Sequence, residues 1–512
     1  LSECPVRISR AVAFCTVVYT CVGAVEAFAA DGHPVSKGNT RSPAAAPRPV
    51  FHLSDAVIAG KAWASQEPKG LPEGTWQVKA GPEGVETDAK TGQIRWTNPT
   101  EGGHRIRTEL RAGGDTVPVE WFLRVVRGTA FSTEVLSPPN YEDFQLPAAG
   151  GWFTDPVFGT RIRRITDDQS VRGFNGERAM FSSDDRFFIV WVGRTIPKLR
   201  LLDGQTGAFV KDLPLAIPDF STVRWSYEPE MIVFPDGHRL MGYNVVTEVS
   251  RVIKEFNEKL GNQKGRLCGG DGNDFDDKGE WLLLEHDGRM FAYNLRTHER
   301  GPEKDMTGYD VDYCTMSASG QYIVGCLRKR GVVLWNRDWT DERQLLPNSP
   351  HMDIAYLNGS QECVVSRISG SRQGKDLWKK HGVDGGSLVA VRFSDGEIFE
   401  VLHSDRWFSP MISAVGGSNR QHVYLAIESY GLDPGDKWHR YFGEIVGVPL
   451  DEGADAIRRL AHHRCRTHDS SSHTFSDQPE AWINHAGDRL FFRSNMDDYT
   501  EKGRHDLFMI EL

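Results

Sequence analysis

A short pattern, a polar turn followed by an apolar strand, occurs seven times between residues 152 and 512 and constrains the fold more than any other feature. The copies include SSDDRFFIVW, DDKGEWLLLE and NHAGDRLFF. Their turns are roughly 40 to 70 residues apart, the period of four-stranded propeller blades with loop insertions. The pattern predicts an all-β fold with a seven-bladed β-propeller over 152–512. The turn anchors are Asp185, Gly237, Gly279, Gly320, Gly359, Gly417 and Gly487.

The two ends of this region suggest how the ring of blades closes. The sequence ends on the apolar strand HDLFMIEL, and RIRRIT at 161–166 is a strand that precedes the first copy. Unpaired strand edges are templates for aggregation. We therefore expect the two segments to pair within one blade.

The first residues have the pattern of an export signal. Arg7 and Arg10 precede the apolar run AVAFCTVVYTCVGAV, and Ala27-Phe28-Ala29 follows it. This order predicts a signal peptide over 1–30, a linker over 31–50 and a periplasmic or extracellular protein. An uncleaved anchor is the alternative. No later stretch approaches about 20 apolar residues, so no membrane span is expected in the mature chain.

Residues 51–129 contain short alternating segments such as LPEGTWQV, TGQIRWTNP and VPVEWFLRVV, which are typical of half-buried strands. The turn-strand-turn TGQIRWTNP before a closing strand resembles the immunoglobulin-like or cadherin-like modules of secreted bacterial proteins. The resemblance implies an N-terminal Ig-like β-sandwich. A second linker is expected over 130–151, where LSPPNYEDFQLPAAGG occurs.

Charge and cysteine content exclude several classes of protein. The chain has 60 basic and 70 acidic residues, a formal net charge of -10, and no Lys/Arg-rich tract, so nucleic acid is not an expected partner. The cysteines after the leader are odd in number and lack C-x-x-C spacing, which argues against a disulfide framework or structural zinc. Cys314 and Cys326 flank one hairpin and could pair. The others are Cys268, Cys363 and Cys465.

The innermost strand of each blade lines the central channel of a propeller, so counting back from each turn leads to one mouth of that channel. Seven positions before the anchors lie Arg178, Glu230, Gly272, Tyr313, Met352, Pro410 and Glu480. A register slip of one residue exchanges the strand faces. In the fifth copy, an anchor on Asn358 places His351 in the ring instead of Met352. We prefer His351, because the channel is wet.

Polar side chains therefore gather at the predicted mouth. Carboxylate and amide oxygens suit a hard cation such as Ca²⁺, and Gln478, Glu480 and Asp353 are the candidate ligands. A plain alternative is that these groups only solvate a water-filled channel, as polar channel residues do in propellers without catalysis.

Two other polar segments have weaker functional patterns. The run DGNDFDDKG at 271–279 resembles a calcium loop but lacks its terminal Glu. The run HHRCRTHDSSSH at 462–473 has no standard metal spacing, although His468 or His473 could reach a substrate at the mouth. No serine has the surroundings of a nucleophile elbow.

The region 152–512 begins with DPVFGTRIRRITDD and ends near QPEAWINHAGDRLFFRSN. Both segments resemble the oligogalacturonate-lyase-like group of propeller proteins. In that group, histidines of the final blade help to hold a metal at the channel mouth. The matching positions here are Gln478 and Glu480, so the resemblance fits related lyases that hold calcium better than those acting on pectate.

The resemblance implies β-elimination on an acidic polysaccharide or oligosaccharide. A base removes the C5 proton of a uronate, an acid serves the leaving oxygen, and a cation or Arg neutralises the carboxylate. We assign His351 as base, Tyr313 as acid, and Arg178 or Arg224 to the carboxylate. Further substrate contacts are expected from Glu230, Trp407 and His473.

Two other functions remain open from the sequence. One is a non-catalytic propeller that binds protein or glycan partners, comparable to the periplasmic translocation propellers built on an S-x-D-G repeat. The other is glycoside hydrolysis by two carboxylates such as Glu230 and Glu480, whose separation would have to match an inverting or retaining mechanism.

Overall fold

The computed structural model describes part of the chain, and all structural statements concern that part. It comprises residues 50–65, 67–68, 71–100, 102–126, 134–139, 141, 144–168, 170–172, 178–193, 197–215, 217, 222–261, 274–347, 352–367, 387–403, 410–413, 422–427, 438, 440–450, 457–465, 478–496 and 505–512. The chain divides into two compact units, Leu1–Gly128 and Thr129–Leu512. The predicted signal peptide and the assigned residues His351, Trp407 and His473 lie outside the described residues.

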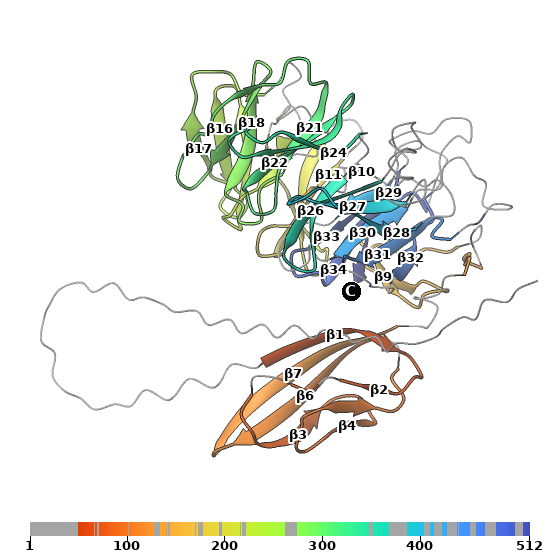
Figure 1. The fold of residues 1–512 in the computed structure, drawn as a ribbon. Helices are drawn as coiled ribbons and strands as arrows, with labels where there is room; N and C mark the ends of the chain where they lie inside the picture. The colour runs from red at the N-terminus through yellow and green to blue at the C-terminus, as the bar shows by residue number, and fades with distance from the viewer. Residues whose placement is uncertain are drawn as a thin grey trace, which may run out of the picture. The chain divides into compact units, whose positions relative to one another are not determined.

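All regular secondary structure in the described ranges is β (Figure 1). Consistent with this, those ranges contain no helix that is long and apolar enough to span a membrane.

The first unit contains two sheets that share one core. One sheet has the order β1 (Val50–Ile58), β7 (Asp115–Val126), β6 (Gly102–Ala112), β3 (Thr75–Ala80), and the other has the order β2 (Trp63–Ala64), β5 (Ile94–Trp96), β4 (Val85–Thr87). Along β6 the apolar Ile106 and Leu110 are buried and Arg107 faces outward, as period-two alternation requires. Because the buried side chains of both sheets form one cluster, the unit is a two-sheet sandwich.

The second unit contains seven sheets. Six follow one another along the chain: β10 (Val171–Arg172) to β11 (Phe187–Val192), β12 (Lys198–Asp203) and β13 (Phe209–Asp212); β14 (Arg224–Trp225) to β15 (Met231–Asp236), β16 (Arg239–Asn244) and β17 (Ser250–Glu255); β18 (Trp281–His286) to β19 (Arg289–Asn294) and β20 (Lys304–Asp305); β21 (Val311–Met316) to β22 (Tyr322–Leu327), β23 (Gly331–Asn336) and β24 (Arg343–Leu346); β25 (Met352–Leu357) to β26 (Gln361–Arg367), β27 (Leu388–Arg392) and β28 (Ile398–Leu402); β29 (Pro410–Ser413) to β30 (His422–Ile427), β31 (Glu444–Pro449) and β32 (Arg458–His462). Neighbouring strands in each sheet are antiparallel.

The seventh sheet combines strands from both ends of this region. Its order is β33 (Glu480–Ile483), β34 (Arg489–Ser494), β35 (Asp506–Glu511), β9 (Arg161–Arg164), β8 (Trp152–Thr154). β35 pairs antiparallel with β9 through Ile510 and Ile162. The strands at the two ends of the region therefore share a sheet, as the sequence pattern indicated.

Apolar clusters fill the spaces between successive sheets. The first sheet packs against the second through Trp225 and against the seventh through Trp482 and Phe491. The turn of the first sheet also contacts that of the seventh, because Asp185 accepts hydrogen bonds from the backbone of His485 and Ala486. Sheets that pack in chain order, with the last against the first, make the unit propeller-like.

One anchor of the sequence pattern lies in a different turn from the others. Asp185 and Gly320 precede the second strand of their sheets and Gly279 precedes β18, the first described strand of its sheet, whereas Gly237 joins β15 to β16, the second and third strands. The turn that joins β14 to β15 is Tyr227–Glu230, which contains no glycine. The pattern therefore identified the next hairpin along the chain. Counting back from Gly237 led to the Tyr227–Glu230 turn rather than to the start of β14.

The described cysteines Cys314, Cys326, Cys363 and Cys465 are buried free thiols. Cys314 packs between the third and fourth sheets and Cys326 between the fourth and fifth. These two side chains point to opposite faces of their sheet, which explains why the hairpin does not form the disulfide that its spacing allowed.

Candidate functional site

Four of the described candidate residues lie at or near the starts of the first strands of their sheets. Arg224 begins β14, Tyr313 lies in β21, Asp353 in β25, and Glu480 begins β33. All four are buried, as are Arg178 and Gln478. Strand starts from several sheets thus place these polar groups in the interior, where each needs a hydrogen-bond partner.

Arg178 and Arg224 meet at a single acceptor. The Nη2 of Arg178 and the Nη1 of Arg224 donate to the carbonyl oxygen of Val223, at 2.6 and 2.8 Å. Each arginine is 1% exposed. Two guanidinium charges so close to one neutral oxygen repel each other strongly in a medium of low dielectric constant. An anion beside the two guanidinium groups would offset this repulsion, and a planar carboxylate matches the guanidinium geometry.

A second contact joins three sheets beside this pair. The backbone N–H of Ala179 donates to Asp274 Oδ2 at 2.5 Å, and the backbone N–H of Asp274 donates to Thr315 Oγ1 at 3.0 Å. Ala179 precedes β11 of the first sheet, Asp274 precedes β18 of the third, and Thr315 belongs to β21 of the fourth. Asp274 received no role from the sequence. Its signal was its place in an acidic run at a strand start.

Glu480 forms an ion pair with Arg493. Glu480 Oε1 lies 3.0 Å from Arg493 Nη2, and the two side chains are 2% and 5% exposed. The residues are directly opposed in the β33–β34 hairpin. Sequence reasoning missed Arg493, although a symmetric count across the turn at Ala486 and Gly487 would have found it. The partner of this buried carboxylate is therefore a guanidinium of its own sheet.

Tyr313 bridges the fourth and fifth sheets. Its hydroxyl donates to the Met352 carbonyl at 3.0 Å and accepts from the Met352 N–H at 3.3 Å. Asp353, the next residue, accepts through Oδ1 from the N–H of Ile354 at 2.7 Å. Both side chains thus hold the start of β25 in place.

Glu230 is not brought together with the other candidates. It ends the turn that follows β14, and its carboxylate bonds to Arg186 at 3.1 Å and Asn244 at 3.3 Å. Such turns contact one another, since the N–H of Tyr227 donates to the Gly279 carbonyl at 3.1 Å. Glu230 therefore lies at the turn end of the first strands, whereas Glu480 lies at the opposite end. The sequence count placed them together because it started from Gly237, which is one hairpin further along the chain.

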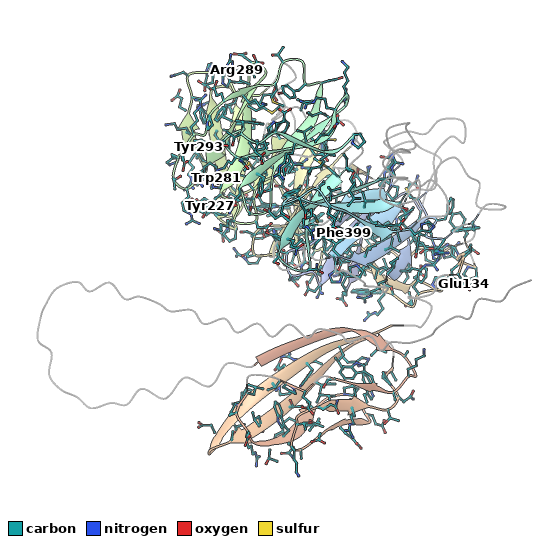
Figure 2. The ribbon with its side chains drawn as sticks, viewed as in Figure 1. Glu134, Tyr227, Trp281, Arg289, Tyr293 and Phe399 are labelled. Atoms are coloured by element: carbon teal, nitrogen blue, oxygen red, sulfur yellow. The ribbon has the colours of Figure 1, made fainter. Side chains whose placement is uncertain are left out.

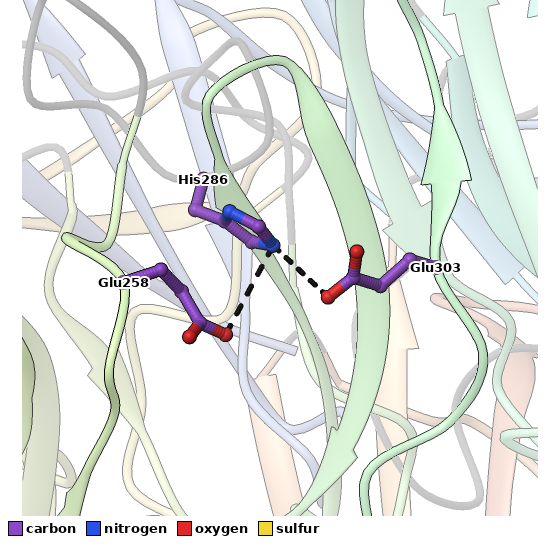
Figure 3. A group of neighbouring side chains, drawn as sticks. All are labelled: Glu258, His286 and Glu303. Carbon is purple, nitrogen blue, oxygen red and sulfur yellow. Dashed lines mark hydrogen bonds and ion pairs between the residues drawn. The ribbon is translucent and has the colours of Figure 1, made fainter.

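Glu258, His286 and Glu303 form a group whose ligand-type atoms lie within 4.8 Å of one another (Figure 3). His286 Nε2 is 3.0 Å from Glu303 Oε1 and 3.9 Å from Glu258 Oε1. Arg300 pairs with both carboxylates. The hydrogen bond from His286, with that from Arg300, outweighs desolvation and lowers the pKa of Glu303. A cation thus already balances this group, which is an ion-pair network.

His463, from the histidine-rich segment, is buried, and its ring bonds only to backbone groups in the described contacts. Its Nδ1 accepts from the N–H of Cys465 at 3.0 Å, and its Nε2 donates to the Ile427 carbonyl at 2.8 Å. Burial lowers the pKa of His463 to about 4, so the ring is neutral near neutral pH. The same segment places Cys465 Sγ 3.6 Å from His505 Nε2.

The fold and the described site define a propeller-like all-β protein with a buried cationic pair. No protein-family model matches the chain, and no curated protein does. Among solved structures, the chain is similar to an oligogalacturonate lyase in complex with manganese, at 12% identity over 72% of this chain and 97% of that one, with a TM-score of 0.47. It is also similar to an oligogalacturonate lyase from Vibrio parahaemolyticus, at 12% identity over 70% and 96%, with a TM-score of 0.48.

Proposed function

We propose that the protein is an exported polysaccharide lyase that cleaves uronate-containing glycans by β-elimination at the channel mouth of a seven-bladed β-propeller. Seven sheets in chain order, with the first packed against the last, support the seven blades. The two-sheet sandwich supports an Ig-like module over 51–129. Export rests on the apolar N-terminal run and its flanking residues.

The observation that carries the proposal is the convergence of Arg178 and Arg224 on the Val223 carbonyl. β-Elimination from a uronate requires the loss of the C5 proton, and the resulting negative charge spreads onto the adjacent carboxylate. Guanidinium groups fixed at that carboxylate stabilise the charge as it develops. A buried pair does so more strongly than an exposed one, because water screens it less.

The acid candidate contacts the residue that follows the base candidate in the sequence. The Tyr313 hydroxyl bonds to the backbone of Met352, which follows the proposed base His351. As the acid, Tyr313 would exchange the Met352 carbonyl for the leaving oxygen of the glycosidic bond. Trp407 and His473 remain proposed substrate contacts, and Glu230 has no role in this site.

A divalent cation such as Ca²⁺ was expected at Gln478, Glu480 and Asp353. The described groups do not fit a cage of this kind, because Glu480 already has a guanidinium partner and Asp353 accepts a backbone hydrogen bond. In the described ranges, neither carboxylate belongs to a group of three clustered ligand side chains. We therefore derive no step of the reaction through a metal.

The test is the ultraviolet absorbance of the unsaturated uronate product, measured with a panel of uronate-containing polysaccharides. We expect wild-type protein to form product and Arg224→Gln to lower kcat/KM by about 10²–10³, as for the loss of one donor to a developing oxyanion. Arg186→Gln is the matched control, because Arg186 pairs with Glu230 at the turn end. A parallel assay with a chelator tests separately whether a divalent cation takes part. Product formation by Arg224→Gln at the wild-type rate would contradict the proposal.

A second function, binding of acidic glycan or protein partners without catalysis, is favoured by the internal hydrogen bonds of Tyr313. Its hydroxyl is held by Met352 as donor and acceptor, which suits a structural group better than a mobile acid. Calorimetric binding of a polysaccharide from the same panel, without product and with weaker binding by Arg224→Gln, would establish this function and exclude the lyase for that glycan.

A further inference from the structure

Four ionisable side chains form a closed network at the edge of the sixth sheet, apart from the proposed site. Glu444 begins β31, Arg459 and His462 lie in β32, and Asp155 lies in the turn between β8 and β9. Each is at most 2% exposed. Arg459 donates through Nε and Nη2 to the two oxygens of Glu444, at 2.7 and 2.5 Å.

Both ring nitrogens of His462 face acceptors. Nε2 lies 3.1 Å from the carbonyl oxygen of Leu136, and Nδ1 lies 3.3 Å from Asp155 Oδ2. A carbonyl oxygen can only accept, and the same Asp155 oxygen already accepts from the backbone N–H of His462 at 2.9 Å. A neutral imidazole has one N–H and can satisfy one of these contacts, whereas an imidazolium has two and satisfies both.

The charges of the network balance when His462 is an imidazolium. Two carboxylates, Asp155 and Glu444, then face two cations, Arg459 and His462, and Glu444 Oε1 is 3.9 Å from His462 Nε2. A buried charge without a partner is costly, so a neutral ring would leave one carboxylate uncompensated. The other groups packed against the ring are uncharged: Phe158 stacks on it, Trp438 meets it edge-on, and the adjacent His463 is neutral.

The carboxylates respond to this environment in different ways. Burial raises the pKa of Asp155, but the hydrogen bond and charge of His462 outweigh that effect and lower it overall. Burial is also the largest influence on Glu444 and raises its pKa despite the contact with Arg459. Asp155 therefore stays ionised through its contact with His462.

The network holds a segment of the chain in place. Arg459 Nη1 donates to the carbonyl of Glu134 at 2.6 Å, and His462 contacts that of Leu136. Glu134 lies at the margin of the second unit (Figure 2). This segment comes shortly after the unit boundary at Gly128 and Thr129. Its backbone carbonyls are thus bound by two side chains of β32.

We propose that His462 is a buried imidazolium that acts as a pH-sensitive clasp, holding residues 134–136 and the turn at Asp155 against β31 and β32 and releasing them when it loses its proton. Loss of the proton leaves one ring nitrogen without a hydrogen opposite an acceptor and one carboxylate without its counter-ion. Segment release lets water reach both groups. The clasp is independent of the proposed lyase activity.

The first experiment measures the ring nitrogens of His462 by NMR and the amide hydrogen exchange of residues 134–137 in the full-length protein, from about pH 6 to about pH 9. We expect both ring nitrogens to be protonated at the acidic end. After correction for intrinsic exchange, opening of the segment should rise about tenfold per pH unit once the ring titrates, because one proton is released. A singly protonated ring at about pH 6, or opening independent of pH, would overturn the proposal.

Variants separate charge from packing. His462→Gln should open the segment at every pH, and His462→Gln with Asp155→Asn should close it again in part, because the pair restores the charge balance. Equal opening in the single and double variants would show that charge balance is irrelevant. His485→Gln is the matched control: His485 Nδ1 contacts Asp185 at 2.8 Å, but its side chain is 22% exposed, so segment 134–137 should behave as in wild type.

Discussion

The buried pair of Glu480 and Arg493 gives a quantitative test of how the polar residues at the strand starts are stabilised. Glu480→Gln keeps the size of the side chain and removes its charge. Arg493 then remains 5% exposed beside a neutral amide. We expect a large loss of stability, since this change isolates a buried guanidinium rather than merely deleting a contact.

The magnitude follows from the geometry. Two unit charges 3.0 Å apart attract by about 5–6 kcal/mol at an effective dielectric constant of about 20. The cost of desolvating both groups offsets much of that attraction in the intact pair. Removing one partner leaves the desolvation cost of the other, and such changes typically lower the free energy of unfolding by about 3–5 kcal/mol.

Urea denaturation followed by intrinsic fluorescence measures the effect. Glu480→Leu with Arg493→Leu should lie within about 1 kcal/mol of the wild type, because an apolar pair has no charge to isolate. Glu397→Gln is the control, because Glu397 pairs with Arg392 but its side chain is 55% exposed. We expect this change to lower the free energy of unfolding by less than about 1 kcal/mol. A loss below about 1 kcal/mol in Glu480→Gln would refute the reasoning.

Two further predictions concern single side chains. Tyr313→Phe leaves the N–H of Met352 without its acceptor and should lower the free energy of unfolding by about 1–3 kcal/mol in urea denaturation. If Tyr313 is the acid, the rate of product formation should also fall by about 10²–10⁴. An unchanged rate would exclude that role. The pKa of His463 falls from 6.5 to about 4 on folding, so its contribution to stability is complete above pH 6.5 and is lost as pH falls through about 4. His463→Gln should therefore remove up to about 3 kcal/mol of acid sensitivity, measured as unfolding free energy against pH; an unchanged acid limb would contradict the assignment.

The order of the strands could be predicted from the sequence because hairpins are local. A turn such as the one at Gly487 lies between two apolar segments that must pair with each other, so the pattern fixes both strands. The same local rule would have identified Arg493 opposite Glu480. It failed at Gly237, because the preceding turn at Tyr227–Glu230 has no glycine, whereas the turn between β15 and β16 has one.

Contacts between sheets could not be predicted in this way. Ala179 and Asp274 are 95 residues apart, and Asp155 and His462 are 307 apart. No periodicity connects such positions, because their proximity depends on how whole sheets pack. Within residues 130–151, where a linker was expected, His462 contacts the carbonyl of Leu136, and the sequence did not predict this contact. The composition of a segment indicates whether it can form an apolar core. It does not indicate whether buried side chains elsewhere in the chain bind the segment's backbone carbonyls, as Arg459 and His462 do here.

The charges at the strand starts indicate which side chains are most suited to a ligand. Glu480 has a guanidinium partner in its own hairpin, so its charge is balanced within the sheet. Arg178 and Arg224 both donate to one carbonyl oxygen, which brings two cationic groups close together. A bound carboxylate would lower the energy of that arrangement and do little for the balanced pair. Arg224→Gln should therefore weaken ligand binding or turnover more than it lowers stability, and Glu480→Gln should do the reverse. That contrast tests whether the function of the mouth lies in its cations.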